Sequence, residues 1–163
     1  RSSVEFTPRR RGDIDFIFLI ANPREGRQIK PTLAFYFAGD IPVYALPSIY
    51  DGLDNPSVNQ DLHGIVFTDA PWILTGYDPL KTNAASSLRP AQGPVQRVRA
   101  MGIDSFRLYA RLQQFNDGDI ATLPGATGIL SMDENGRIHR RLEVARFIEG
   151  KATLEDRAGT ASD

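Results

Sequence analysis

The sequence predicts an α/β fold in which a parallel sheet is flanked by helices and a β-hairpin follows near the C-terminal end. Three observations carry this prediction. A nearly continuous apolar run, DIDFIFLIANP, is typical of a central parallel strand that is buried on both faces. A helical pattern and a second apolar strand follow it within about 30 residues, the length of one βαβ unit. Asn135-Gly136 lies between two alternating apolar runs, which indicates a hairpin.

The residues that start and end its elements place the first βαβ unit in the sequence. The strand Ile14–Ile20 ends at Asn22-Pro23, where an Asn cap and a Pro at the first helical position predict a helix start. The helix is expected over Arg24–Ala38, with Pro31 kinking or splitting it. Gly39-Asp40 then ends the helix, and Ile41–Ala45 predicts a second parallel strand with a right-handed crossover.

The sequence of the middle of the chain predicts a third strand with a long connection before it and another after it. Leu46–His63 is rich in Pro, Ser, Asn, Asp and Gly, which favours a long surface loop with a helical turn near Val58–Leu62. Ile65–Thr68 reads as a short strand that Pro71 ends. Asp78–Gly93 has few large apolar residues and is expected to be an exposed connection.

The last part predicts a helix and then strands. Apolar residues at helical spacing indicate a helix over Pro94–Phe115, with a division expected near Gly102 and a stop at Asn116–Asp119. The hairpin about Glu134–Gly136 is expected to be followed by an edge strand, and the polar tail from Ala152 to be flexible.

Composition narrows the function classes. The chain has 163 residues, which suits one domain, and its 19 basic and 20 acidic residues leave a net charge of −1. Without a basic surplus, neither nucleic acid nor an anionic membrane is an expected partner. The lack of cysteine excludes disulfides, thiolate catalysis and sulfur-ligated zinc.

No pattern predicts catalytic, cofactor-binding or metal-binding residues. His63 and His139 have no second ligand at metal spacing, and glycine-rich phosphate loops and G-x-S-x-G elbows are missing. Asp51, Asp54 and Asp69 could in principle meet as paired carboxylates, but their spacing favours a surface-loop role.

Trp72 and the basic run near the N-terminal end each have two possible interpretations. Trp72 is either a stacking aromatic in a cleft or a core residue between layers, and the second reading is favoured. The basic run Arg9–Arg11 is expected to be a solvated face, although it could contact an acidic partner.

Longer segments of the chain resemble a known family. They are DIDFIFLIANPREGRQIKPTLAFYFAGDIPVYALPSIYDG, DLHGIVFTDAPWIL, RVRAMGIDSFRLYARL and GATGILSMDENGRIHRRLEVARFIEGK. In order and separation they resemble the LppC/LpoA family of outer-membrane lipoproteins, which activate a bifunctional penicillin-binding protein.

The resemblance implies part of a type I periplasmic-binding-protein-like fold, with two α/β lobes around a cleft. Residues 13–151 would be the C-terminal portion of that domain, mostly second lobe, with a first-lobe helix near residues 95–115. Residues 1–12 and 152–163 would be flexible ends. The family's N-terminal helical-repeat domain, which carries the lipidated cysteine, would be absent from this chain, and membrane attachment would depend on it.

The resemblance also implies a function and a candidate site. The implied role is a non-catalytic regulator of peptidoglycan synthesis in the periplasm, anchored to the outer membrane in the full-length protein, whose partner is a class A penicillin-binding protein. The alternative is a periplasmic sensor or carrier of a small ligand. Since binding-protein ligands lie at strand carboxyl ends, the cleft candidates are Asn22, Pro23, Ser48, Tyr50, Asp69 and Trp72.

Overall fold

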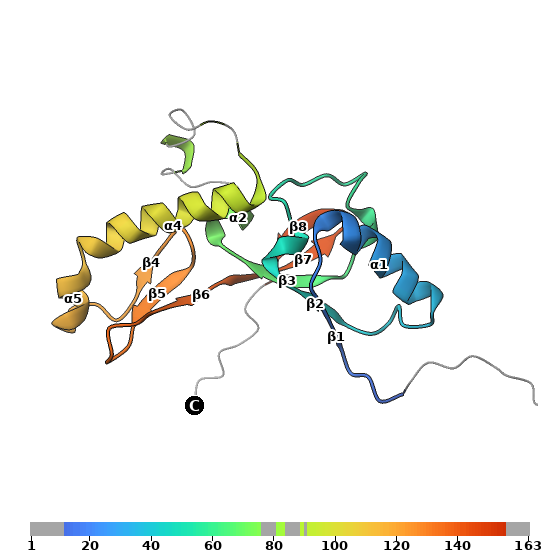
Figure 1. The fold of residues 1–163 in the computed structure, drawn as a ribbon, viewed down its shortest axis with the longest axis horizontal. Helices are drawn as coiled ribbons and strands as arrows, with labels where there is room; N and C mark the ends of the chain where they lie inside the picture. Colours follow the sequence, from blue (N-terminus) through green and yellow to red (C-terminus); the bar gives the residue numbers. More distant parts are fainter. Residues whose placement is uncertain (1–11, 76–80, 84–88, 90, 156–163) are drawn as a thin grey trace, which may run out of the picture.

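Two β-sheets of unequal size organise the chain (Figure 1), in a computed structural model that describes residues 12–75, 81–83, 89 and 91–155. The larger, five-stranded sheet has the order β1-β2-β3-β7-β8, and the smaller has the order β4-β5-β6. The strands of the larger sheet are β1 (Ile17–Leu19), β2 (Val43–Ala45), β3 (Val66–Asp69), β7 (Glu143–Ile148) and β8 (Lys151–Leu154). Those of the smaller are β4 (Leu123–Pro124), β5 (Ile129–Met132) and β6 (Ile138–Arg141).

The N-terminal βαβ unit forms, but the expectation that its first strand is central and buried on both faces is wrong. β1 lies at the edge of the larger sheet, and Phe16, Phe18 and Ile20 are exposed. β1, β2 and β3 are parallel neighbours, and helix α1 (Pro23–Phe35) connects the first two. The Asn22 side chain accepts a hydrogen bond from the Glu25 backbone, and the Glu25 carboxylate accepts one from the Asn22 backbone, so a full capping box starts the helix. Pro31 lies inside this one helix, so the expectation of a split there is wrong. A proline removes only one backbone hydrogen bond, and the neighbouring turns continue the helix.

The loop after β2 contributes to the core rather than running over the surface. Two short 3₁₀ helices form in it, η1 (Pro47–Ile49) and η2 (Gln60–Leu62), and the second confirms the helical turn expected near Val58–Leu62. Ile49, Tyr50 and Leu62 are buried. A Cβ on Gly26 of α1 would collide with the Ile49 and Leu62 side chains, so glycine lets α1 pack closely on this loop.

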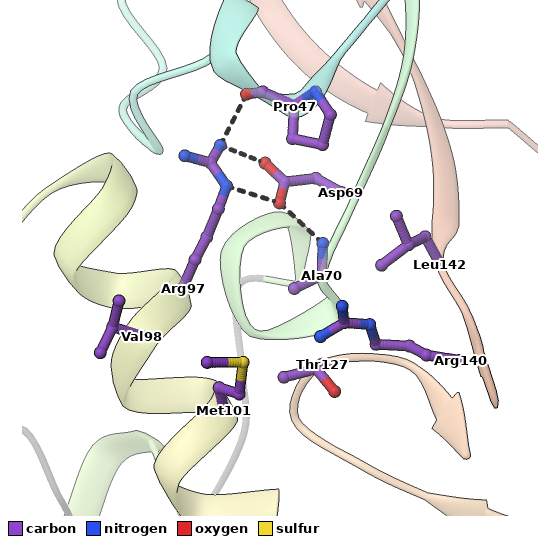
Figure 2. A pocket seen from close by; sticks show the side chains of 9 residues that line it. All are labelled: Pro47, Asp69, Ala70, Arg97, Val98, Met101, Thr127, Arg140 and Leu142. Atoms are coloured by element: carbon purple, nitrogen blue, oxygen red, sulfur yellow. Dashed lines mark hydrogen bonds and ion pairs between the residues drawn. The ribbon is translucent and has the colours of Figure 1, made fainter. Parts of the chain in front are cut away.

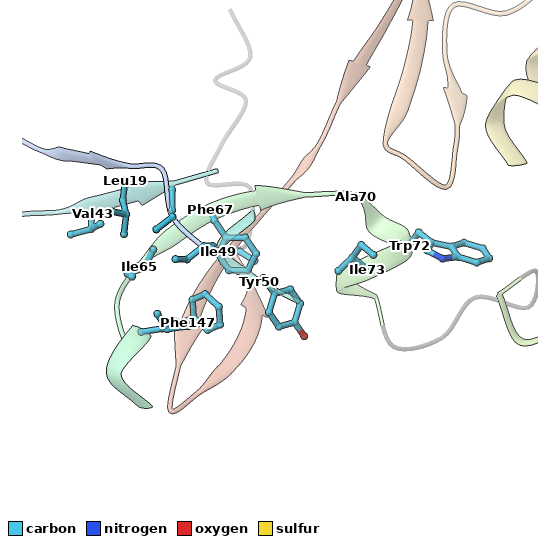
Figure 3. Close-up of a cluster of buried hydrophobic side chains, with 14 of the residues drawn as sticks. Leu19, Val43, Ile49, Tyr50, Ile65, Phe67, Ala70, Trp72, Ile73 and Phe147 are labelled. Atoms are coloured by element: carbon cyan, nitrogen blue, oxygen red, sulfur yellow. The ribbon is translucent and has the colours of Figure 1, made fainter. Parts of the chain in front are cut away.

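An aromatic cluster fills the core beneath the larger sheet (Figure 3). Phe67 of β3 stacks on Phe147 of β7 with ring centroids 4.9 Å apart, and Tyr50 lies within 5.7 Å of both rings. β3 and β7 run antiparallel, so the sheet is mixed rather than wholly parallel. The opposite face of the sheet leaves Phe18 and Tyr44 exposed in this chain.

The helices that follow β3 differ from the sequence expectation in their boundaries. Pro71 starts a short helix, α2 (Pro71–Leu74), after β3. The expected long helix is divided into α4 (Gly93–Tyr109) and α5 (Leu112–Asn116), and the division falls at Ala110-Arg111 rather than near Gly102. A Cβ on Gly102 would meet nothing within 4 Å, so this glycine lies on the open side of a continuous helix.

The C-terminal strands confirm the predicted hairpin, but the strands that follow it differ from the expectation. β5 and β6 pair across the predicted Asn-Gly turn. β7 is central, between β3 and β8, and is not the expected edge strand. Residues 151–154 form β8 on β7, so the tail is an ordered strand at its start and not flexible from Ala152. β8 has only four residues, so its polar–apolar alternation is too short to stand out from the polar tail in the sequence. The rest of that tail and residues 1–11 lie outside the described residues.

A second, smaller core lies between α4, α5 and the small sheet. Its buried members are Phe115, Leu123 and Leu130, with Leu108 and Met132 packed beside them. Among the described residues, no helix combines the length and the apolar composition needed to cross a membrane.

Truncation of the central ring tests this core. Because Phe147 is completely buried between Tyr50 and Phe67, Phe147→Ala is expected to lower the free energy of unfolding by about 3–5 kcal/mol in urea denaturation. The matched control is Phe106→Ala, which removes the same atoms from a ring that is 80% exposed, and its expected effect is within about 0.5 kcal/mol. Equal losses for the two variants would contradict this core.

Candidate functional site

A pocket of about 270 Å³ lies where the two sheets meet (Figure 2). One wall comes from the larger sheet, at the carboxyl end of β3, and another from α4. The third wall comes from the chain that leads from β6 through Leu142 into β7. The lining residues are Pro47, Asp69, Ala70, Arg97, Val98, Met101, Thr127, Arg140 and Leu142.

An ion pair between β3 and α4 dominates this junction. Arg97 donates through Nε to Asp69 Oδ1 at 2.9 Å and through Nη2 to Asp69 Oδ2 at 2.5 Å. The Asp69 side chain is 1% exposed and that of Arg97 is 22% exposed. A planar guanidinium matches a carboxylate in this two-point geometry, which fixes the orientation of both groups.

The same guanidinium also satisfies backbone carbonyls after β2. Nη2 of Arg97 lies 2.7 Å from the Pro47 carbonyl oxygen and 2.8 Å from that of Tyr50. Asp69 Oδ1 accepts a further hydrogen bond from the Ala70 backbone at 2.7 Å. One side chain of α4 therefore ties the ends of two neighbouring strands together (Figure 2).

A second buried carboxylate holds α4 to the turn between β4 and β5. Asp104 accepts hydrogen bonds from the backbone N–H groups of Ala126 and Thr127, each at 2.7 Å, and from the Thr127 hydroxyl at 2.6 Å. The turn approaches so closely that a Cβ on Gly125 would lie 2.6 Å from an Asp104 oxygen. The Trp72 backbone N–H donates to the Ala126 carbonyl at 3.0 Å, so α2 joins the same turn.

The predicted cleft residues near β1 and β2 have structural partners. Asn22 and Pro23 begin α1, and the Ser48 hydroxyl donates to the Ala21 carbonyl at 2.9 Å. The Tyr50 hydroxyl donates to Asp54 at 2.9 Å. Burial, together with this bond, raises the pKa of the Tyr50 phenol far above its usual value, so the phenol keeps its proton.

The other two predicted cleft residues lie at the end of β3. Trp72 is a core residue, 2% exposed, whose Nε1 donates to Gln96 at 3.0 Å. Asp69 alone of the six lines the pocket, and it is buried in an ion pair rather than on a loop surface. The structure thus brings Asp69 to the junction and places the other five around it, and a ligand role for any of them stays a prediction.

Arg97, Asp104 and Arg140 are junction residues that sequence reasoning did not single out. Nothing in the local pattern marks them, because each is one charged residue on an otherwise amphipathic element. Among the residues described, no group of three metal-binding side chains comes together. His63 accepts a hydrogen bond from the Glu149 backbone at 3.3 Å, and His139 lies 2.9 Å from Asp133.

Comparison with known proteins identifies the family. Residues 1–150 match the family described as "LppC putative lipoprotein". The chain belongs to the LppC family. Among its relatives, the "Penicillin-binding protein activator LpoA" of Vibrio cholerae is 28% identical over 142 residues, which are 87% of this chain and 24% of the relative. The protein of the same name from Vibrio antiquarius is 30% identical over 146 residues, 89% of this chain and 24% of the relative.

Solved structures agree on the fold. The "LpoA (YraM) C-domain from Haemophilus influenzae, a regulator of PBP1A" superposes with a TM-score of 0.74 at 21% identity, over 90% of this chain and 46% of that one. A "putative branched-chain amino acid ABC transporter" from Chromobacterium violaceum has a TM-score of 0.62 at 26% identity, over 82% of this chain and 42% of that one. This LppC chain therefore has part of a periplasmic-binding-protein-like fold, as predicted, and spans about a quarter of its curated relatives.

The ion pair of the LppC chain can be tested by a double-mutant cycle. Arg97→Met leaves the buried Asp69 carboxylate without its counter-charge and is expected to cost about 3–5 kcal/mol of unfolding free energy. Adding Asp69→Asn removes the orphaned charge, so the double variant should lose less than the sum of the two single variants. Additive losses in urea denaturation would show that the two side chains are not coupled.

The Asp104 cage makes a separate prediction. Asp104→Asn keeps the shape of the side chain but turns one oxygen into an N–H₂ group that faces N–H donors. The free energy of unfolding should therefore fall by about 1–3 kcal/mol. Asp117→Asn, an exposed change of the same kind at the end of α5, should be nearly neutral. Hydrogen exchange should also speed up at the Ala126 and Thr127 amides in the first variant only, and unchanged exchange there would argue against the cage.

Proposed function

We propose that this chain belongs to a non-catalytic regulator of peptidoglycan synthesis that binds and activates a bifunctional class A penicillin-binding protein. The observation that carries the proposal is the LppC family match over residues 1–150, together with relatives that are named penicillin-binding protein activators. These names favour an activator over the sensor or carrier that the fold alone also allows.

The geometry of the junction supports a non-catalytic role. The carboxylates of Asp69 and Asp104 are each held by several internal donors, and Arg97 is engaged by Asp69 and two carbonyls. The hydrogen bonds of these groups go to other parts of the chain, so the groups hold its elements together. Activation by such a protein works through differential binding to two conformations of its partner.

The chain's place in the whole protein is part of the proposal. Residues 13–151 are the C-terminal portion of a two-lobed domain, in which the five-stranded sheet belongs to the second lobe and α4, α5 and the small sheet to the first. The small core of Phe115, Leu123 and Leu130 supports the division, and Ala100 of α4 packs in the larger core where the two parts meet. In the full-length protein a lipidated N-terminal region would hold this domain in the periplasm at the outer membrane.

The test uses purified full-length protein and a purified class A penicillin-binding protein. We expect direct binding and a rise in the rate of peptide cross-linking when the two are mixed. Binding with no change in cross-linking would contradict activation, and no binding would contradict the partner. A thermal-shift screen with amino acids, sugars and muropeptides addresses the alternative: stabilisation by one of these without any effect on the synthase would favour a sensor or carrier.

A further inference from the structure

The small sheet has one face that is not packed against the rest of the described chain. Leu130 and Met132 of β5 face the core formed with α5. Because side chains alternate along a strand, the residues between them, Ile129 and Ser131, face the other way. Arg141 and His139 of β6 lie directly opposite these two in the register and share their face.

A shallow groove of about 290 Å³ runs over this outer face. Its lining residues are Thr122, Ile129, Ser131, His139, Arg140 and Arg141, which include three basic side chains and no acidic one. Charged side chains are seldom fully buried without partners, so this composition is typical of a surface that faces solvent. The opposite, apolar face of the same sheet is the one that packs.

The basic side chains of the outer face form a row. Arg137, His139 and Arg141 occupy alternate positions along one extended segment, so they recur about every 7 Å. Neither the Arg137 nor the Arg141 side chain makes a hydrogen bond or ion pair within the described part of the chain, and both residues are exposed.

One internal carboxylate stands beside the row and is already engaged. Asp133 accepts hydrogen bonds from the backbone N–H groups of Asn135 and Arg137, each at 2.9 Å, and its second oxygen lies 2.9 Å from His139. The bond to His139, followed by that to the Arg137 backbone, lowers the pKa of Asp133, which therefore remains a carboxylate. It is engaged with His139, and among the described residues the two arginines have no counter-charge.

We propose that the groove over β5 and β6, lined by His139 and Arg141 and extended by Arg137, docks an acidic segment of the partner penicillin-binding protein. This inference rests on the proposed function and adds the contact surface to it. An extended segment with carboxylates on alternate residues repeats at the same spacing as the basic row, so its carboxylates can meet Arg137 and Arg141 together. Such complementary charge speeds association and fixes the register of docking.

The experiment compares two charge reversals in the full-length protein. The test variant is Arg137→Glu with Arg141→Glu. The control is Arg24→Glu with Arg111→Glu, which changes the net charge equally at exposed residues of α1 and of the link between α4 and α5. The Kd for the synthase should rise about tenfold or more in the test variant and by less than about threefold in the control. Raising the salt concentration should weaken wild-type binding more than that of the test variant.

The outcomes separate the two proposals. If the wild-type protein does not bind the synthase, the proposed function fails. If it binds and both variants bind equally well, or weaken equally, the docking surface fails alone. Binding to vesicles of phosphatidylethanolamine and phosphatidylglycerol is measured in parallel. A test variant that loses vesicle binding but keeps synthase binding would overturn the proposal in favour of a lipid surface. Arg137→Gln with Arg141→Gln, which removes charge without reversing it, should give an intermediate loss.

Discussion

The contact between Arg97 and Asp69 is the constraint on which the rest of this chain depends. Asp69 ends β3 in a place where water hardly reaches, and a carboxylate is tolerated there only with a fixed counter-charge and further donors. Arg97 meets this need from α4 and also satisfies carbonyls at the end of β2. This guanidinium therefore anchors the start of α4 to the larger sheet, where the bond from Trp72 to Gln96 and the burial of Ala100 add to the contact.

The fold was predictable from sequence wherever the signal was local. The apolar run at Phe16–Ile20, the Asn22 cap and the Asn135-Gly136 turn each depend on a few adjacent residues, and the strand, helix start and hairpin that they predict are present. The central place predicted for the strand was wrong, because the apolar run does not show which neighbours the strand has, and β1 is an edge strand. The pairing of β7 with β3 was not predictable, because it joins segments more than 70 residues apart and no local pattern encodes the partner. The same holds for Ile49 and Leu62, which look like loop residues until α1 covers them.

The candidate site was predictable only in its location. The rule that polar groups gather at strand carboxyl ends placed Asp69 correctly at the junction. It could not identify Arg97, which lies 28 positions further along in a helix whose other arginines look the same in the sequence. It also could not show that the Tyr50 hydroxyl donates a hydrogen bond to Asp54 and the Trp72 indole N–H donates one to Gln96. Sequence spacing describes which groups can approach, whereas burial decides which of them must pair.

The passage from β6 to β7 has a mechanical consequence. Between these strands stands only Leu142, so an extended chain runs from one sheet straight into the other (Figure 1). Extended backbone is already close to its maximum length and has almost no slack. It therefore resists being pulled apart while it still permits torsion about its own axis. A force applied to the small sheet would reach the larger one along this strand, while α4, held to one sheet by Arg97 and to the turn of the other by Asp104, limits rotation about it.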